Sequence, residues 1–158
     1  MILVECKPDE ALVRILTGSH TVIHCGNKSG VCRMLSKKYR GAIGLIDHDP
    51  GSAQPVYIKN LIRNNNARRI DNITILYDPA RDNYIIMLYP HLEGWILDSA
   101  KKAGVKPDKY NLPNDEDMLH KEINTRTQNF ERLLQELVTK SQKLALLREI
   151  LEKPREHY

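Results

Sequence analysis

The sequence has few aromatic residues, few cysteines and no long apolar run. Only 6% of its 158 residues are aromatic, and three are cysteines, an odd and sparse set that argues against a disulfide-bonded scaffold. The longest apolar run, residues 84–89, has the length of a strand and falls far short of the ~20 residues that cross a membrane. The N-terminus lacks a charged start followed by a long apolar stretch, so we expect no secretory signal. These absences predict a soluble, cytoplasmic protein without a membrane partner.

Charge is distributed unevenly along the chain. The formal net charge is +4, with +5 in residues 1–113 and −1 in residues 114–158. A basic head with a near-neutral tail fits a domain that faces nucleic acid and carries a packing element. An ordinary basic surface fits the same numbers, so charge alone leaves the question open.

Short β-branched runs alternate with helical patterns in the first fifty residues. Strands are expected over residues 1–5, 21–25 and 41–46. Helices are expected over residues 7–17 and 31–39, the second after a tight loop at residues 26–30. This alternation predicts an α/β, Rossmann-like, mainly parallel sheet flanked by helices.

The strict alternation of strands and helices ends after about residue 50. Residues 51–71 are polar and are predicted to form a loop with a short helix, whereas residues 73–77 and 84–89 predict strands and residues 92–103 a helix. We divide the chain into an α/β domain, residues 1–113, and a C-terminal helical extension, residues 114–158.

Apolar residues recur at helical spacing in the extension. They are Phe130, Leu133, Leu134, Leu137, Val138, Leu144, Leu147 and Leu151. Two interpretations stay open: the stripe packs on the α/β domain, or it forms a homodimer or docks another partner.

Acidic residues follow two of the predicted strands. Glu5 ends the first, and Asp47 and Asp49 end the third. Ligands of parallel α/β sheets bind at the carboxyl ends of strands, and residues i and i+2 of an extended chain point to the same face. If the first and third strands are neighbours, three carboxylates meet there and resist joint ionisation. A divalent cation removes this conflict, and oxygen donors suit Mg²⁺ or Mn²⁺.

These segments resemble the Toprim domain of topoisomerases, primases and OLD-type nucleases. The resemblance rests on Leu3-Val4-Glu5-Cys6-Lys7-Pro8-Asp9-Glu10, on Gly26-Asn27-Lys28-Ser29-Gly30 and on Leu45-Ile46-Asp47-His48-Asp49. Tyr89-Pro90-His91-Leu92-Glu93-Gly94-Trp95 further resembles an element of small standalone Toprim-like proteins. Cys6 departs from the pattern, because most family members have Gly there.

The resemblance and the residue chemistry assign roles. Asp47 and Asp49 are expected to ligate the metal, and Glu5 to ligate it or to act as general base. Lys28 is expected to neutralise a phosphate, unless it is a solvated loop residue. Glu93 is either a ligand of a second metal or an acid that complements a helix dipole.

Two basic clusters are candidates for contacts with a phosphate backbone, although solvated helix faces fit them equally. Their residues are Arg33, Lys37, Arg63, Arg68 and Arg69.

Three functions follow from these residues. The first is a metal-dependent nuclease that acts on DNA or RNA, with DNA favoured, and has a separately encoded ATPase as partner because the chain lacks the P-loop spacing. The second is a non-catalytic Toprim-like adaptor that docks a partner through its C-terminal helices. The third is a small-nucleotide or phosphosugar enzyme on a generic doubly wound sheet.

Overall fold

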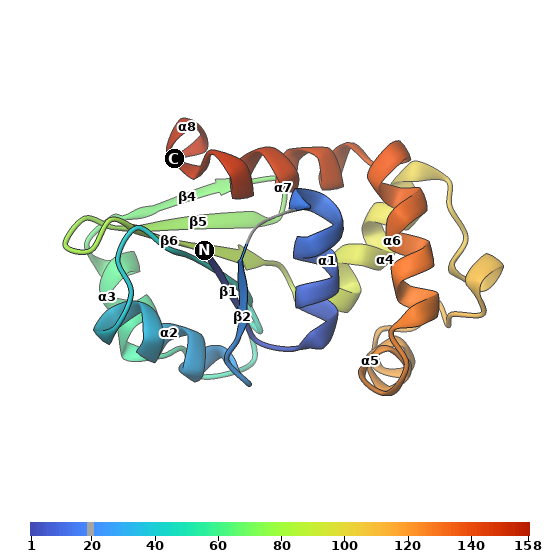
Figure 1. Ribbon diagram of the computed structural model, residues 1–158, viewed down its shortest axis with the longest axis horizontal. Helices are drawn as coiled ribbons and strands as arrows, with labels where there is room; N and C mark the ends of the chain where they lie inside the picture. Colours follow the sequence, from blue (N-terminus) through green and yellow to red (C-terminus); the bar gives the residue numbers. More distant parts are fainter. Residues whose placement is uncertain (19–20) are drawn as a thin grey trace.

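A six-stranded sheet lies between two layers of helices in the computed structural model, which describes residues 1–18 and 21–158 (Figure 1). The strands are β1 (Ile2–Val4), β2 (Val22–His24), β3 (Ile43–Asp47), β4 (Ala67–Ile70), β5 (Ile73–Asp78) and β6 (Asn83–Leu88). The helices are α1 (Lys7–Thr17), α2 (Lys28–Lys37), α3 (Val56–Arg63), α4 (Leu92–Ala103), α5 (Glu116–Thr125), α6 (Gln128–Lys140), α7 (Gln142–Glu152) and α8 (Pro154–His157), with a 3-10 turn, η1 (Pro107–Tyr110).

The strand order is β2-β1-β3-β6-β5-β4. The first four strands of this order are parallel, whereas β5 runs antiparallel to both β6 and β4. The predicted α/β class and the mainly parallel sheet are therefore confirmed, in a mixed sheet consistent with the Rossmann-like class. The pairing of β1 with β3 also meets the condition on which the acidic cluster depends.

Both faces of the sheet are covered. Alternate residues of β1 show this: Ile2 and Val4 pack into one core, and Leu3 packs into the other. The Leu3 core lies under α2 and α3, and the opposite core lies under α1, α4, α6 and α7 (Figure 1). A sheet buried on both faces explains why its central strands are almost continuously apolar.

The C-terminal extension lies against the α/β domain. Helix α6 contacts α1 and α4, and α7 contacts the same two helices. Phe130, Leu137, Leu144 and Leu151 are buried in the core that also holds Ile2 and Val4. The apolar stripe thus packs within this chain, and its buried residues are not exposed to a second one.

Two predicted segments differ from the structure. Residues 51–71 contain a strand, β4, which was missed because Ala67-Arg68-Arg69-Ile70 is an exposed edge strand with little apolar character. The predicted tight loop at residues 26–30 is also wrong, because α2 begins at Lys28 after an Asn27 cap whose side chain accepts a hydrogen bond from the Gly30 N–H at 2.7 Å. Gly30 suggests a loop, but glycine is needed here because a Cβ would collide with the Cys25 carbonyl.

Among the helices that the structure describes, none is both long and apolar enough to span a membrane.

Candidate functional site

Glu5 and Asp47 meet at the carboxyl edge of the sheet. Val4, the last residue of β1, is paired with Leu45 of β3, so Glu5 directly follows one strand where Asp47 ends its neighbour. The Glu5 Oε2 accepts a hydrogen bond from the Asp47 N–H at 3.4 Å. Asp47 Oδ1 in turn accepts one from the Leu92 N–H at 2.8 Å, at the start of α4. The structure therefore brings together the two residues that the sequence placed at strand ends.

Asp49 also lies at this edge of the sheet, but its backbone conformation differs from the predicted one. Strand β3 ends at Asp47, and Asp49 has a φ of +49°, so the extended geometry assumed for residues i and i+2 is wrong here. Aspartate tolerates this left-handed conformation better than most residues. The Asp49 N–H donates to the Pro90 carbonyl at 2.8 Å, and Lys28 Nζ lies 3.5 Å from Asp49 Oδ2. These contacts hold the loop so that its carboxylate faces the cluster.

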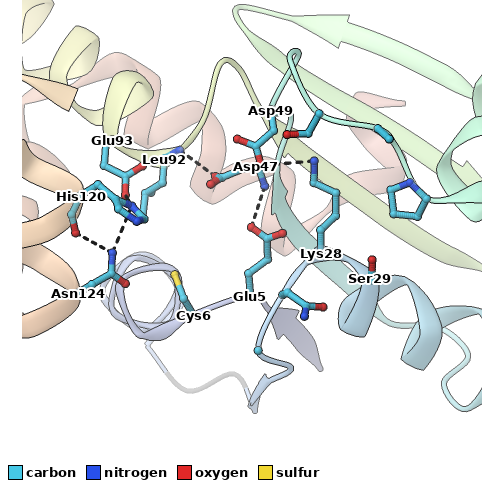
Figure 2. Close-up of a pocket in the computed structure, with 15 residues that line it drawn as sticks. Glu5, Cys6, Lys28, Ser29, Asp47, Asp49, Leu92, Glu93, His120 and Asn124 are labelled. Carbon is cyan, nitrogen blue, oxygen red and sulfur yellow. Dashed lines mark hydrogen bonds and ion pairs between the residues drawn. The ribbon is translucent and has the colours of Figure 1, made fainter. Parts of the chain in front are cut away.

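All three carboxylates line one cavity of about 430 Å³. Figure 2 shows Glu5, Asp47 and Asp49 at its centre, with Lys28 on one side. Glu93, His120 and Asn124 stand on the other side, so the C-terminal extension contributes to the cavity wall through α5 (Figure 2).

Burial and repulsion from neighbouring carboxylates raise the pKa values of Glu5 and Asp47 when no cation is present. Burial, followed by repulsion from Asp9, raises the pKa of Glu5 to about 7. Burial, together with the charges of Asp9, Glu5, Glu93 and Asp49, raises the pKa of Asp47 to about 9. Carboxyl groups with pKa values raised this far lack a neighbouring positive charge large enough to stabilise their ionised form.

Asp9 is the acid of this cluster that the sequence interpretation missed. It sits in the first turn of α1 with 2% of its surface exposed, and burial raises its pKa to about 6. It accepts hydrogen bonds from the Cys6 N–H at 3.2 Å and from the Cys6 thiol at 3.1 Å. A first-turn acid after Pro8 is ordinary helix chemistry, so only the tertiary fold shows that Asp9 is close enough to Asp47 to raise its pKa.

Cys6 occupies its position without backbone strain. Its φ of −145° and ψ of 176° are extended values that any residue adopts, so the local conformation does not require glycine. Burial raises the pKa of the Cys6 thiol, which makes a nucleophilic thiolate unfavourable. The cysteine acts as the N-terminal cap of α1.

The donor chemistry of the cluster fits a hard divalent cation. Glu5, Asp47 and Asp49 offer only oxygen atoms. Among residues 1–18 and 21–158, no group of three or more His, Cys, Asp or Glu side chains is arranged so that it could hold a metal ion by itself. Mg²⁺ does not need such a cage, because one or two carboxylates with water and substrate phosphate satisfy it.

The Lys28 side chain makes its hydrogen bonds mainly with the loop that follows β3. Its Nζ donates to the His48 carbonyl at 2.9 Å and to Gln54 Oε1 at 3.3 Å, and its side chain is only 12% exposed. The alternative of a solvated loop lysine is therefore wrong. Its contact with Asp49 places a positive charge beside the acids while it holds the loop in place.

Glu93 lies in the cavity wall with both oxygens near histidines. The buried carboxylate has Oε1 2.7 Å from His120 Nδ1 and Oε2 3.2 Å from His91 Nδ1. Asn124 Nδ2 donates to the His120 carbonyl at 2.7 Å and lies 3.2 Å from His120 Nδ1. His120 and Asn124 were missed because their approach depends on how the extension folds back. Their spacing of four residues on a helix is the only local signal that they share a face.

The basic residues are distributed over α2, α3 and β4. Arg33 and Lys37 are exposed on α2, Arg63 ends α3, and Arg68 and Arg69 lie on the edge strand β4. The Arg68 guanidinium donates to the Tyr158 carbonyl at 3.0 Å, which leaves Arg69 as the β4 arginine that faces a cavity. Their contacts with a phosphate backbone stay a prediction.

Comparisons with known proteins add no relative. No protein-family model matches the chain, and neither the curated proteins nor the solved structures searched gave a match.

Proposed function

We propose that this protein is a divalent-metal-dependent phosphodiesterase of the nuclease type that acts on nucleic acid. One observation carries the proposal: Glu5, Asp47 and Asp49 share a cavity at the carboxyl edge of a mainly parallel sheet. This edge is where α/β sheets bind ligands.

The electrostatics of the cavity support a cation as its missing partner. Two of the acids, Glu5 and Asp47, have raised pKa values, and Lys28 divides its donors between Asp49 and the loop. Mg²⁺ or Mn²⁺, when bound, would polarise a phosphodiester and lower the pKa of a bound water. Asp47 and Asp49 are the residues that would hold the cation.

The side chains of the cavity divide the remaining tasks. Glu5, whose pKa burial raises to about 7 in the metal-free protein, is the carboxylate placed to take a proton from water once a cation at Asp47 and Asp49 favours its ionised form. Lys28 holds the Asp49 loop and supplies positive charge toward a phosphate. His120 and Asn124 on the opposite wall face the space that a substrate would fill.

We assign the domain to the Toprim type and favour DNA over RNA as substrate, with a separately encoded ATPase as partner. The assignment rests on a glutamate directly after β1 and an Asp-x-Asp sequence that begins at the last residue of β3, on strands that are neighbours. The adaptor alternative is less favoured, because the apolar stripe it requires is buried in the chain's own core.

A cleavage assay tests the proposal. Purified protein is incubated with single- and double-stranded DNA and RNA in Mn²⁺, Mg²⁺ or EDTA. We expect cleavage with either metal, none in EDTA, and a loss of at least about a hundredfold in Asp47→Asn and Glu5→Gln, since each removes a group of the reaction centre. Asp117→Asn, an exposed aspartate in the first turn of α5, is the matched control. Equal cleavage by Asp47→Asn and the wild type would refute the proposal.

A further inference from the structure

A second cavity lies beside the acidic one, at the same edge of the sheet. It has a volume of about 240 Å³, and its lining shares no residue with that of the acidic cavity. We call it the Tyr89 pocket; its lining residues are His48, Arg69, Asn72, Ile73, Thr74 and Tyr89. His48 stands between Asp47 and Asp49 in the chain, so the two cavities are separated by one loop.

The loop between the cavities is fixed to the end of β6. The His48 N–H donates to the Leu88 carbonyl at 2.9 Å, and the next residue, Asp49, donates to Pro90 at 2.8 Å. The Tyr89 N–H donates to the Asn72 carbonyl at 3.0 Å, which joins the pocket rim to the turn before β5. The pocket is therefore held in a set position relative to the acidic cluster.

The wall of the Tyr89 pocket is aromatic and open. Tyr89 is 44% exposed, which is unusual for a large apolar ring in this chain, and it meets the His48 ring edge-on at 5.3 Å between centroids. His48 Nδ1 is buried without a hydrogen-bond partner among the described residues, so its ring is positioned by the contact with Tyr89. Exposed rings at the mouth of a pocket are suited to a planar aromatic ligand.

The floor and rim add the other features such a ligand needs. Thr74 is buried in the floor, where it supplies a hydroxyl, and the neighbouring Ile73 borders the pocket while its side chain packs in the core on the other face of the sheet. Arg69 and Asn72 are exposed at the rim. An inorganic phosphate would not need the tyrosine, and a purely apolar ligand would not need the arginine.

We propose that the Tyr89 pocket binds an unstacked nucleobase of the strand whose phosphodiester occupies the acidic cavity, with Arg69 on a flanking phosphate. This inference rests on the proposed function and narrows its substrate to single-stranded or locally unpaired nucleic acid. A base within a duplex is stacked on both faces and cannot enter a pocket of this kind.

Fluorescence anisotropy with two labelled DNA strands tests the inference. One is a short single-stranded oligothymidine, and the other is an abasic strand of the same length and charge; EDTA prevents metal-dependent cleavage. We expect the wild type to bind the base-bearing strand at least about fivefold more tightly, as base–aromatic stacking predicts. Tyr89→Leu should lose this preference, and Tyr89→Phe should keep it because the ring is retained. Arg69→Gln should weaken binding of both strands alike.

The outcomes separate the inference from the proposed function. Equal affinity of the wild type for both strands, or no binding of either strand, would overturn the base pocket, whereas the nuclease proposal is decided separately by the cleavage assay in Mn²⁺ or Mg²⁺. The wild-type comparison depends on no variant. The thermal unfolding midpoints of Tyr89→Leu and Tyr89→Phe show whether those variants are folded.

Discussion

Two clusters around carboxylates in this molecule have opposite electrostatics. At the sheet edge, the charges next to Asp47 are mostly other acids, and its pKa is raised to about 9. On α6, hydrogen bonds from Lys109, Lys140 and Tyr110 lower the pKa of Glu136 to about 2. In the α6 cluster, Lys109 and Lys140 neutralise the carboxylate. At the sheet edge, Lys28 supplies less positive charge than the carboxylates there require. A cluster that opposes its own ionisation is typical of a functional site rather than of a stabilising one.

The largest expected consequence is a pH dependence of the metal-free protein. A carboxyl whose pKa is raised in the folded state contributes stability below its unfolded pKa and loses it as the pH rises through the folded value. The pKa values of about 6, 7 and 9 for Asp9, Glu5 and Asp47 therefore predict that the free energy of unfolding falls by several kcal/mol between about pH 5 and pH 9. Urea unfolding in EDTA at several pH values measures it.

Repeating the urea unfolding series at the same pH values with Mg²⁺ in place of EDTA extends this test. Since a bound cation stabilises the ionised carboxylates, the free energy of unfolding should fall less toward high pH. A free energy of unfolding that rises steadily from pH 5 to pH 9 in EDTA would contradict our account of the edge cluster.

A second prediction concerns Asp47→Asn in the metal-free protein. The amide resembles the protonated acid and keeps an oxygen that can accept the Leu92 N–H. We expect the variant to be more stable than the wild type by about 1–3 kcal/mol at pH 8, as a higher urea midpoint would show. Asp117→Asn, which changes an exposed acid, should have little effect. A less stable Asp47→Asn protein would mean that the carboxylate stabilises the fold.

The smallest effect is expected for the cluster on α6, with the opposite sign. Glu136→Gln removes the charge that Lys109 and Lys140 share, so the urea midpoint should fall, and by less than Asp47→Asn raises it. High salt should reduce this loss, because it screens exposed ion pairs. Glu152→Gln, at the exposed end of α7, is the control. A stabilised Glu136→Gln variant would remove the contrast between the two clusters.

The sequence predicted the part of the site that depends on local pattern. Short buried runs separated by helices imply parallel neighbouring strands, and strand ends then place Glu5 and Asp47 together. The helix over residues 92–103 was correct to the residue, because apolar residues recur at helical spacing within it and Gly104 ends it.

The rest of the site depends on contacts between distant segments. Asp9 comes close to Asp47 only because α1 packs where it does, and His120 reaches Glu93 only because α5 folds back onto α4. The apolar stripe of the extension is equally compatible with self-packing and with a partner, since periodicity shows which face is buried and not what buries it. Strand β4 was missed because edge strands need little apolar surface.

Calorimetric titration of Mn²⁺ tests the central claim most directly, because it requires neither the right nucleic acid nor an ATPase partner. We predict that the wild type binds Mn²⁺ and that Asp47→Ala binds it at least about a hundredfold more weakly, while Asp117→Ala binds like the wild type. Equal binding by the wild type and Asp47→Ala, or no binding by either, would contradict the claim that the acids at the edge of the sheet form a cation site.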